Sequence, residues 1–257
     1  MEMSLIARFK QILKDLSAER KRDIPLPIYI FWWIIRLLLI YAAIKSTLVH
    51  GPDTLQLWVN VLLSYIFTIF KFFPKEKFIF SRFSFRLETI ALILNLVTTY
   101  FGNYLNLYYT LPAWDMIVHF CGGIVGVYFG YEFTVAAAKK QKEFRPIVGV
   151  ICGIGWCSWA AIFWEIFEFN YDQFTGSNIQ HWSLILSGNL AKGVEFYSFG
   201  AHPERYALFD TMTDLMCGFY GALIGGVIVF IWLSKRIKKV EAAKQQAEII
   251  IAASENK

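Results

Sequence analysis

The sequence predicts an all-α fold, a polytopic membrane bundle of six transmembrane helices with both termini on the cytoplasmic side. Apolar runs of about twenty residues, the length needed to cross a bilayer, recur along the 257-residue chain. Apolar residues make up 56% of the chain and charged residues 18%, whereas charged residues make up about 25% of an average soluble domain. Lys and Arg gather between the apolar runs, as in membrane proteins.

The apolar runs divide the chain into an N-terminal segment, a membrane domain and a tail. Residues 1–24 are expected to form an amphipathic helix on the cytoplasmic membrane surface, because apolar and basic side chains alternate at helical spacing. Residues 25–233 form the membrane domain, and residues 234–257 a charged cytoplasmic tail. The expected spans cover residues 28–49, 54–73, 87–109, 114–138, 146–169 and 209–233. A longer extracytoplasmic loop covers residues 170–208.

The distribution of basic residues predicts the orientation. Six Lys and Arg precede the first span, four lie at 74–86, four at 139–145 and six in the tail, while the alternate loops carry almost none. Cytoplasmic loops are enriched in Lys and Arg, so a membrane crossed several times, with these segments and both termini on the cytoplasmic side, is expected. The net charge of +5 and the basic, Phe-rich segment 74–86 could suggest nucleic-acid binding. An interfacial loop explains that segment better, and no nucleic-acid partner is expected.

Three short stretches each place two ionisable side chains one helical turn apart, in or beside an apolar run. The spacing puts both members of each pair on one helix face, and the predicted topology puts all three pairs in the outer leaflet. The resulting candidate site consists of Asp115, His119, Glu165, Glu168, Asp210 and Asp214. At ~1.5 Å rise per residue, Asp115, Glu168 and Asp210 form a shallow layer, with His119, Glu165 and Asp214 about one turn deeper.

Five crowded carboxylates repel one another, so some must be protonated or neutralised by cations. No Lys or Arg lies on the outer halves of the last three expected spans. Divalent metal ions are therefore the expected counter-charge, and oxygen ligands with one imidazole suit Zn, Mn, Mg or Fe. Simpler explanations exist for single members: Asp115 and Asp210 as N-caps, Glu168 as an interfacial residue and His119 as a core histidine. Glu165 and Asp214 lie deeper and are harder to explain in this way.

Glycines are concentrated in the same three spans. Gly122, Gly126 and Gly130 recur at fourfold spacing in the fourth span, and similar groups occur in the fifth and sixth. Small residues at this spacing allow membrane helices to approach closely. Spans four to six are therefore expected to form a tight core that holds the acids, with spans one to three packed around it.

Other polar residues give weaker signals. Arg36 can extend toward the membrane surface or pair with Glu132 or Glu88, and Asn103 and Asn106 can line the site or make ordinary interhelical hydrogen bonds. In the long loop, Asp172, His181 and His202 are further candidate ligands, and residues 181–186 (HWSLIL) could form a partial lid. Cys121, Cys152, Cys157 and Cys217 contain no CxxC pair and are expected to be free thiols.

The order of these motifs, Trp-Asp-x-x-x-His-Phe, Glu-x-x-Glu and Asp-Thr-x-x-Asp-x-x-x-Gly, resembles the YjdF-like family of bacterial inner-membrane proteins of unknown function. It is also similar, more distantly, to VanZ-like membrane proteins, in which Asp-x-x-x-His-Phe opens a span. The resemblance covers residues 114–221 and implicates Asp115, His119, Glu132, Glu165, Glu168, Asp210 and Asp214. The segment before Asp210 (PERYALFD) departs from the pattern of the YjdF-like group. The resemblance implies a site and no established activity.

These observations favour a metal-assisted hydrolysis or transfer reaction on a lipid or an envelope precursor, with membrane lipids or a lipid-linked substrate as partners. Glu165, the deeper acid of its pair, is the favoured general base, and Asp214 is the second candidate catalytic residue. Two alternatives remain open. One is a cation- or proton-coupled transporter, and the other is a non-catalytic envelope-stress or resistance factor that binds a ligand at the same site.

Overall fold

The computed structural model describes residues 5–51, 54–111, 113–138, 145–176, 180 and 206–255, and their regular secondary structure is entirely helical. The prediction of an all-α protein is confirmed for these residues. The elements, in chain order, are α1 (Leu5–Asp23), α2 (Leu26–Leu48), α3 (Thr54–Leu63), α4 (Ile66–Phe70), η1 (Ile79–Arg82), α5 (Phe85–Asn95), the π-helix η2 (Leu96–Tyr104), α6 (Leu107–Thr110), α7 (Trp114–Ala137), α8 (Pro146–Thr175) and α10 (Tyr206–Glu255).

In the part of the chain that the structure describes, four helices are long and apolar enough to cross a membrane: α2, α7, α8 and α10. They correspond to the expected first, fourth, fifth and sixth spans. The expected second span consists of the shorter apolar helices α3 and α4, and the expected third consists of α5 continued by η2. The structure therefore supports a membrane bundle, and the count of six spans stays a prediction.

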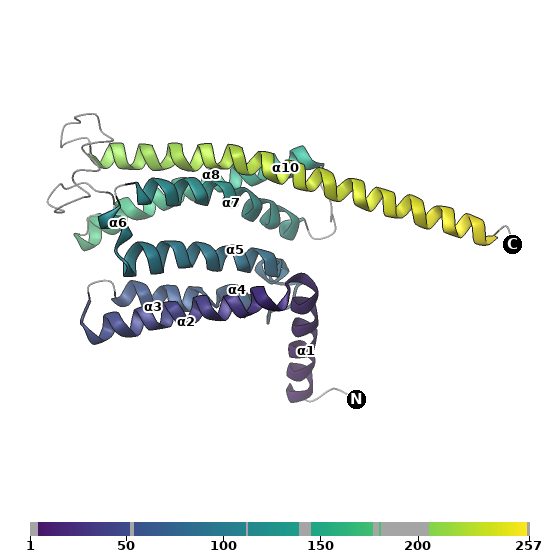
Figure 1. Ribbon diagram of the computed structural model, residues 1–257, viewed down its shortest axis with the longest axis horizontal. Helices are drawn as coiled ribbons and strands as arrows, with labels where there is room; N and C mark the ends of the chain where they lie inside the picture. Colours follow the sequence, from purple (N-terminus) through teal and green to yellow (C-terminus); the bar gives the residue numbers. More distant parts are fainter. Residues whose placement is uncertain are drawn as a thin grey trace.

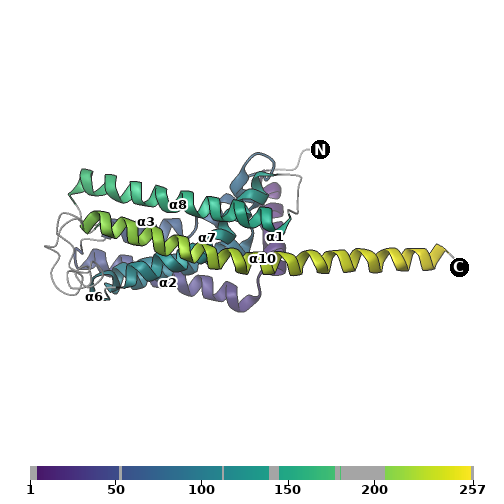
Figure 2. The ribbon, with the colours of Figure 1, turned by 90° about the horizontal axis from the view of Figure 1, so that it is seen from above.

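The helices form two layers (Figure 1). One layer contains α2, α3, α4 and α5, and the other contains α7, α8 and α10. Helix α1 lies across one end of the bundle, and α10 extends beyond that same end, so both termini lie toward it (Figures 1 and 2). Because α7 and α10 begin at the opposite end and α8 finishes there, their polar pairs gather away from the termini.

Two helices continue beyond the expected span boundaries. Helix α8 extends past residue 169 to Thr175, where the left-handed conformation of Gly176 (φ 69°) ends it. The expected loop at 170–208 therefore begins with helical residues. Helix α10 continues through the charged segment after residue 233 to Glu255 without a break, so the described part of the tail is a continuation of the last membrane helix.

Glycines bring α7, α8 and α10 into close contact, as the sequence predicts. A Cβ atom on Gly123 of α7 would lie 2.2 Å from the carbonyl oxygen of Gly218 on α10, and one on Gly153 of α8 would lie 2.5 Å from that of Val127 on α7. No real side chain fits at such distances, so only glycine allows these backbones to approach this closely. These three helices have the most extensive mutual contacts in the described structure.

Candidate functional site

The centre of the site is a pair of side chains on the first two turns of α7. Asp115 and His119 are four residues apart and share one helix face. The Nε2 atom of His119 lies 3.6 Å from Oδ1 of Asp115, and both side chains are largely enclosed, with 13% and 22% of their surfaces exposed. The sequence prediction that these two residues act together is consistent with this geometry.

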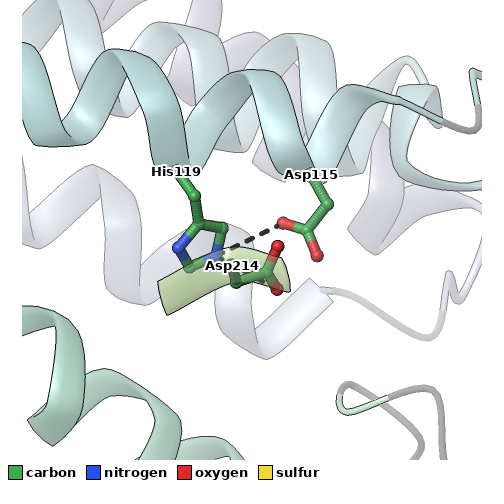
Figure 3. Close-up of side chains that lie close together, drawn as sticks. All are labelled: Asp115, His119 and Asp214. Atoms are coloured by element: carbon green, nitrogen blue, oxygen red, sulfur yellow. Dashed lines mark ion pairs between the residues drawn. The ribbon is translucent and has the colours of Figure 1, made fainter. Parts of the chain in front are cut away.

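Helix α10 adds a second carboxylate to this pair. Oδ2 of Asp214 lies 3.6 Å from the same Nε2 atom of His119, and the Asp214 side chain is 2% exposed (Figure 3). One ligand atom from each of Asp115, His119 and Asp214 lies within 4.8 Å of the others. The close approach of α7 and α10 at their glycines therefore joins residues that are about a hundred positions apart in the chain.

Helix α8 supplies three buried acids beside this triad. Glu165, Glu168 and Asp172 are 5%, 8% and 4% exposed. The indole N–H of Trp164 donates a 2.7 Å hydrogen bond to Glu168, and the backbone N–H of Gln180 donates one of 2.9 Å to Asp172. The Glu165 carboxylate lies beside the Thr211 side chain of α10 and near the charges of Asp210 and Asp115.

The acids of all three helices lie within electrostatic range of one another. Asp214 interacts with the charges of Asp115, Asp210, Glu165 and Glu168. Only Asp115 and Asp214 have an oxygen in the compact group around His119, whereas Glu165, Glu168 and Asp210 lie outside it. The compact group therefore combines one residue of the expected shallow layer with two of the deeper layer.

Sequence reasoning missed Tyr108. This residue belongs to the short helix α6, which follows Asn106 in a left-handed conformation (φ 64°). Tyr108 lies within electrostatic range of Asp115, Glu168 and Asp214, and its ring packs against Gly102. The sequence suggests an ordinary interfacial tyrosine here, and only the turn at Asn106 directs the chain back toward the acids. The sign of this turn that the sequence offered was Asn106, whose side-chain amide precedes a short aromatic segment.

The structure also places several of the other polar residues that the sequence singled out. Asn106 has a backbone role in the α6 turn, and Asp172 lies in the last turn of α8 instead of a loop. Arg36 pairs with Glu88 at 2.9 Å, one of the two partners expected for it, while Glu132 accepts hydrogen bonds from Tyr128 and from the Ser84 backbone. His181, His202 and residues 181–186 lie outside the described residues.

The donor set suits a divalent cation. Two atoms that each lie ~2.1 Å from one metal ion are ~3–4 Å apart, and both carboxylates are 3.6 Å from the imidazole nitrogen. Among the described residues, no Lys or Arg forms an ion pair with Glu165, Glu168 or Asp214. Oxygen ligands with one imidazole fit Mg, Mn, Fe or Zn, and burial increases the need for a counter-charge.

Among the comparisons with known proteins, the family model indicates a membrane protein, and no comparison specifies a reaction. The chain is 26% identical over 129 residues to an uncharacterized protein of Thermotoga maritima, a match that covers 50% of this chain and 54% of that protein. The matched region thus spans about half the length of this curated relative. No solved structure matches the chain. A family model described as "Predicted membrane protein (DUF2238)" matches residues 27–235, which contain all six candidate site residues, and the chain therefore belongs to this family of membrane proteins.

Proposed function

We propose that this protein is a membrane metalloenzyme that binds a divalent cation through Asp115, His119 and Asp214. The observation that carries the proposal is the compact group of one nitrogen and two oxygen ligands, assembled from two helices within 4.8 Å. His119 supplies a nitrogen, and the two aspartates supply anionic oxygens that neutralise the charge of the cation. This ligand set suits Zn, Mn, Mg or Fe. Such a cation supplies Lewis-acid chemistry to a phosphoryl or carbonyl group.

Glu165 has the properties of a general base in this proposal. Its carboxylate is buried on α8 beside Thr211 of α10, and an oxygen that Thr211 does not engage can accept a proton from water. Asp214 holds His119 in place from the opposite helix. Glu168 keeps its orientation through the Trp164 N–H, and together with Asp210 it adds negative charge near the ion.

The location of the site favours a membrane substrate. The site lies among apolar helices at the end of the bundle away from the termini (Figure 1). With six spans and cytoplasmic termini, as the basic loops predict, this end faces outward across a bacterial cytoplasmic membrane. The substrate class is then a lipid or a lipid-linked envelope precursor. The Thermotoga maritima relative supports a bacterial setting, and the likeness to YjdF-like and VanZ-like proteins rests on the motifs alone.

The first experiment measures metal content in the detergent-purified chain by elemental mass spectrometry. We expect one to two ions per protein, lost in His119→Ala and Asp214→Asn. The matched controls are His50→Asn and Asp15→Asn, because His50 and Asp15 are an exposed histidine and an exposed aspartate outside the site. A wild-type protein that folds but stays metal-free after incubation with each of the four metals would overturn the proposal.

A second experiment separates binding from catalysis. Metal-loaded protein is mixed with vesicles of bacterial lipid extract, and the products are followed by mass spectrometry. Glu165→Gln should retain the metal and lose turnover, because the amide keeps the shape of the side chain and cannot accept the proton. Full turnover by Glu165→Gln would exclude Glu165 as the base.

Transport is the second candidate function, and buried charges in the other layer favour it. Arg36, Glu88 and Lys71 are 3%, 1% and 4% exposed, and ionisable residues inside membranes commonly mark ion or proton pathways. Proteoliposomes that contain a pH-sensitive dye distinguish the two functions. Proton or metal flux that disappears in Asp214→Asn, without lipid turnover, would favour transport.

A further inference from the structure

A cavity lies at the end of the bundle opposite the acidic site. It has a volume of about 910 Å³ and is bounded by the end of α1, the start of α5, the second half of α7 and the part of α10 that follows the apolar segment. Because α7 and α10 run from the acidic site to this cavity, the two sites are separated by the length of the membrane helices (Figure 1). The cavity takes no part in the proposed metal chemistry.

The lining of this cavity carries an excess of positive charge. Its five cationic side chains are Arg86, Lys235, Arg236, Lys238 and Lys239, and its two acids are Asp23 and Glu132. Five positive and two negative charges leave a formal charge of +3. The cations belong to two different helices that bound one space, so an anion in the cavity would lie near an excess of positive charge.

Both acids of the cavity already have partners. Asp23 lies 3.2 Å from the guanidinium of Arg22. Glu132 accepts a 2.8 Å hydrogen bond from the Tyr128 hydroxyl and a 3.2 Å hydrogen bond from the Ser84 backbone N–H. Among the described residues, the five cations form no ion pair. The positive charge of the lining is therefore available to an external anion.

One wall of the cavity is aromatic and apolar. The Tyr128 and Trp232 rings are 5.6 Å apart and nearly perpendicular, and Tyr131 lies 5.9 Å from the same indole. Val135 and Val240 extend this wall, and the Arg236 guanidinium lies 5.6 Å from the centre of the Trp232 ring. Aromatic rings beside cations are typical of the level of lipid head groups, where one end of the ligand is apolar and the other is hydrated.

We propose that this cavity binds the head group of an anionic phospholipid. The cations lie near the phosphate, and the wall of Tyr128, Trp232 and Val135 contacts the glycerol and the upper acyl chain. Basic pockets between membrane helices recognise anionic head groups in this way. A free phosphate ion would use the cations and leave the aromatic wall exposed, so the lining fits an amphiphile better. The lipid would anchor α10 where it leaves the membrane.

Native mass spectrometry of the full-length protein in mild detergent tests the proposal, with phosphatidylglycerol and phosphatidylcholine as probes. We expect phosphatidylglycerol to bind at least tenfold more tightly. Lys235→Gln and Lys239→Gln should each weaken its binding about fivefold, and the double variant about 25-fold. Lys244→Gln is the matched control, because Lys244 is an exposed lysine of the same helix outside the cavity. It should change binding less than twofold.

Arg86→Gln provides a second test from a different helix if the α10 variants fail to fold, and Trp232→Leu tests the apolar wall. Equal losses in Lys244→Gln and the cavity variants would show unspecific attraction to the basic tail and overturn the proposal. Displacement of the lipid by millimolar inorganic phosphate, with no effect of Trp232→Leu, would identify a soluble-anion site and also overturn it. Loss of lipid binding in Trp232→Leu and resistance to phosphate would support the lipid.

Discussion

His119 on α7 and Asp214 on α10 face each other across a helix interface, with Nε2 and Oδ2 3.6 Å apart. One turn further along each helix, Gly123 and Gly218 bring the two backbones into direct contact. The polar contact depends on this glycine contact, because a side chain at Gly123 would meet the Gly218 backbone and hold the helices apart by more than the short aspartate can span, whereas a Cβ on Gly218 would come no closer than 3.9 Å to its neighbours. Packing and ligand geometry are thus determined by the same turns of the two helices.

Gly123→Ala should therefore damage both stability and metal binding. The new Cβ would lie 2.2 Å from the Gly218 carbonyl oxygen and 2.9 Å from the Ala222 backbone nitrogen, so α10 must shift. We expect a loss of about 2 kcal/mol in unfolding free energy, measured by thermal denaturation in detergent, and a loss of bound metal. Gly122→Ala is the control, since its Cβ would meet no atom within 4 Å. Equal stability of the two variants would contradict the interface described here.

Glu165→Gln should stabilise the metal-free protein. The wild-type carboxylate is 5% exposed and lies near the charges of Asp210 and Asp115, so its negative charge is poorly solvated and is repelled. A neutral amide of the same shape removes that penalty, and a gain of about 1 kcal/mol is expected in chelator at neutral pH. The control is Glu76→Gln at an exposed position, which should change stability little. A loss of stability in Glu165→Gln would show that the carboxylate has a favourable partner in the metal-free state.

The sequence predicts the helices and the main site because both depend on short-range spacing. Long apolar runs imply spans, and four-residue spacing places Asp115 beside His119 irrespective of the rest of the fold. The glycine pattern and the alternating helix directions further indicate that Asp214 would join them. These signals are periodic, and helix geometry translates them directly into position.

Features that depend on how the helices pack and turn in the folded protein could not be predicted from periodic spacing. Glu88 and Glu132 are both near Arg36 in the predicted topology, and only the packing of α2 against α5 selects Glu88. Tyr108 approaches the acids because of one left-handed residue at Asn106, which no periodicity reveals. A helical tail after residue 233 is, by contrast, predictable from helix propensity in the charged segment, whereas its continuity with the last membrane helix is not, because the hydropathy pattern ends there.

Arg36 and Glu88 should behave as a buried ion pair. Their side chains are 3% and 1% exposed and 2.9 Å apart, and Thr68 and the Ser64 carbonyl also bind the Arg36 guanidinium. Arg36→Met leaves an unpaired buried carboxylate and should cost about 3–5 kcal/mol, whereas adding Glu88→Met should restore most of the loss. The unfolding free energies of the two single variants and of the double variant, measured by denaturation, form a double-mutant cycle.

An exposed ion pair provides the control for this cycle. Lys75 and Glu19 are also 2.9 Å apart, but 49% of the Lys75 side chain is exposed. Lys75→Ala should cost less than about 1 kcal/mol. Additive losses in the Arg36 and Glu88 variants, without recovery in the double variant, would contradict a coupled pair.

The six-span topology can be tested by single cysteines that flank the shorter helices. Val49→Cys, Lys77→Cys and Thr110→Cys place thiols before α3, after α4 and after η2, at exposed positions. If both helical pairs cross the membrane, an impermeant maleimide should label the first and third in intact cells and the second only after lysis, because cytoplasmic segments are inaccessible. The background lacks the native thiols of Cys121, Cys152, Cys157 and Cys217. Labelling of Lys77→Cys in intact cells would show that α3 and α4 do not cross together. Protection of Thr110→Cys would then reverse the orientation of every later helix, whereas labelling of Thr110→Cys would show that α5 and η2 do not cross either and leave that orientation unchanged.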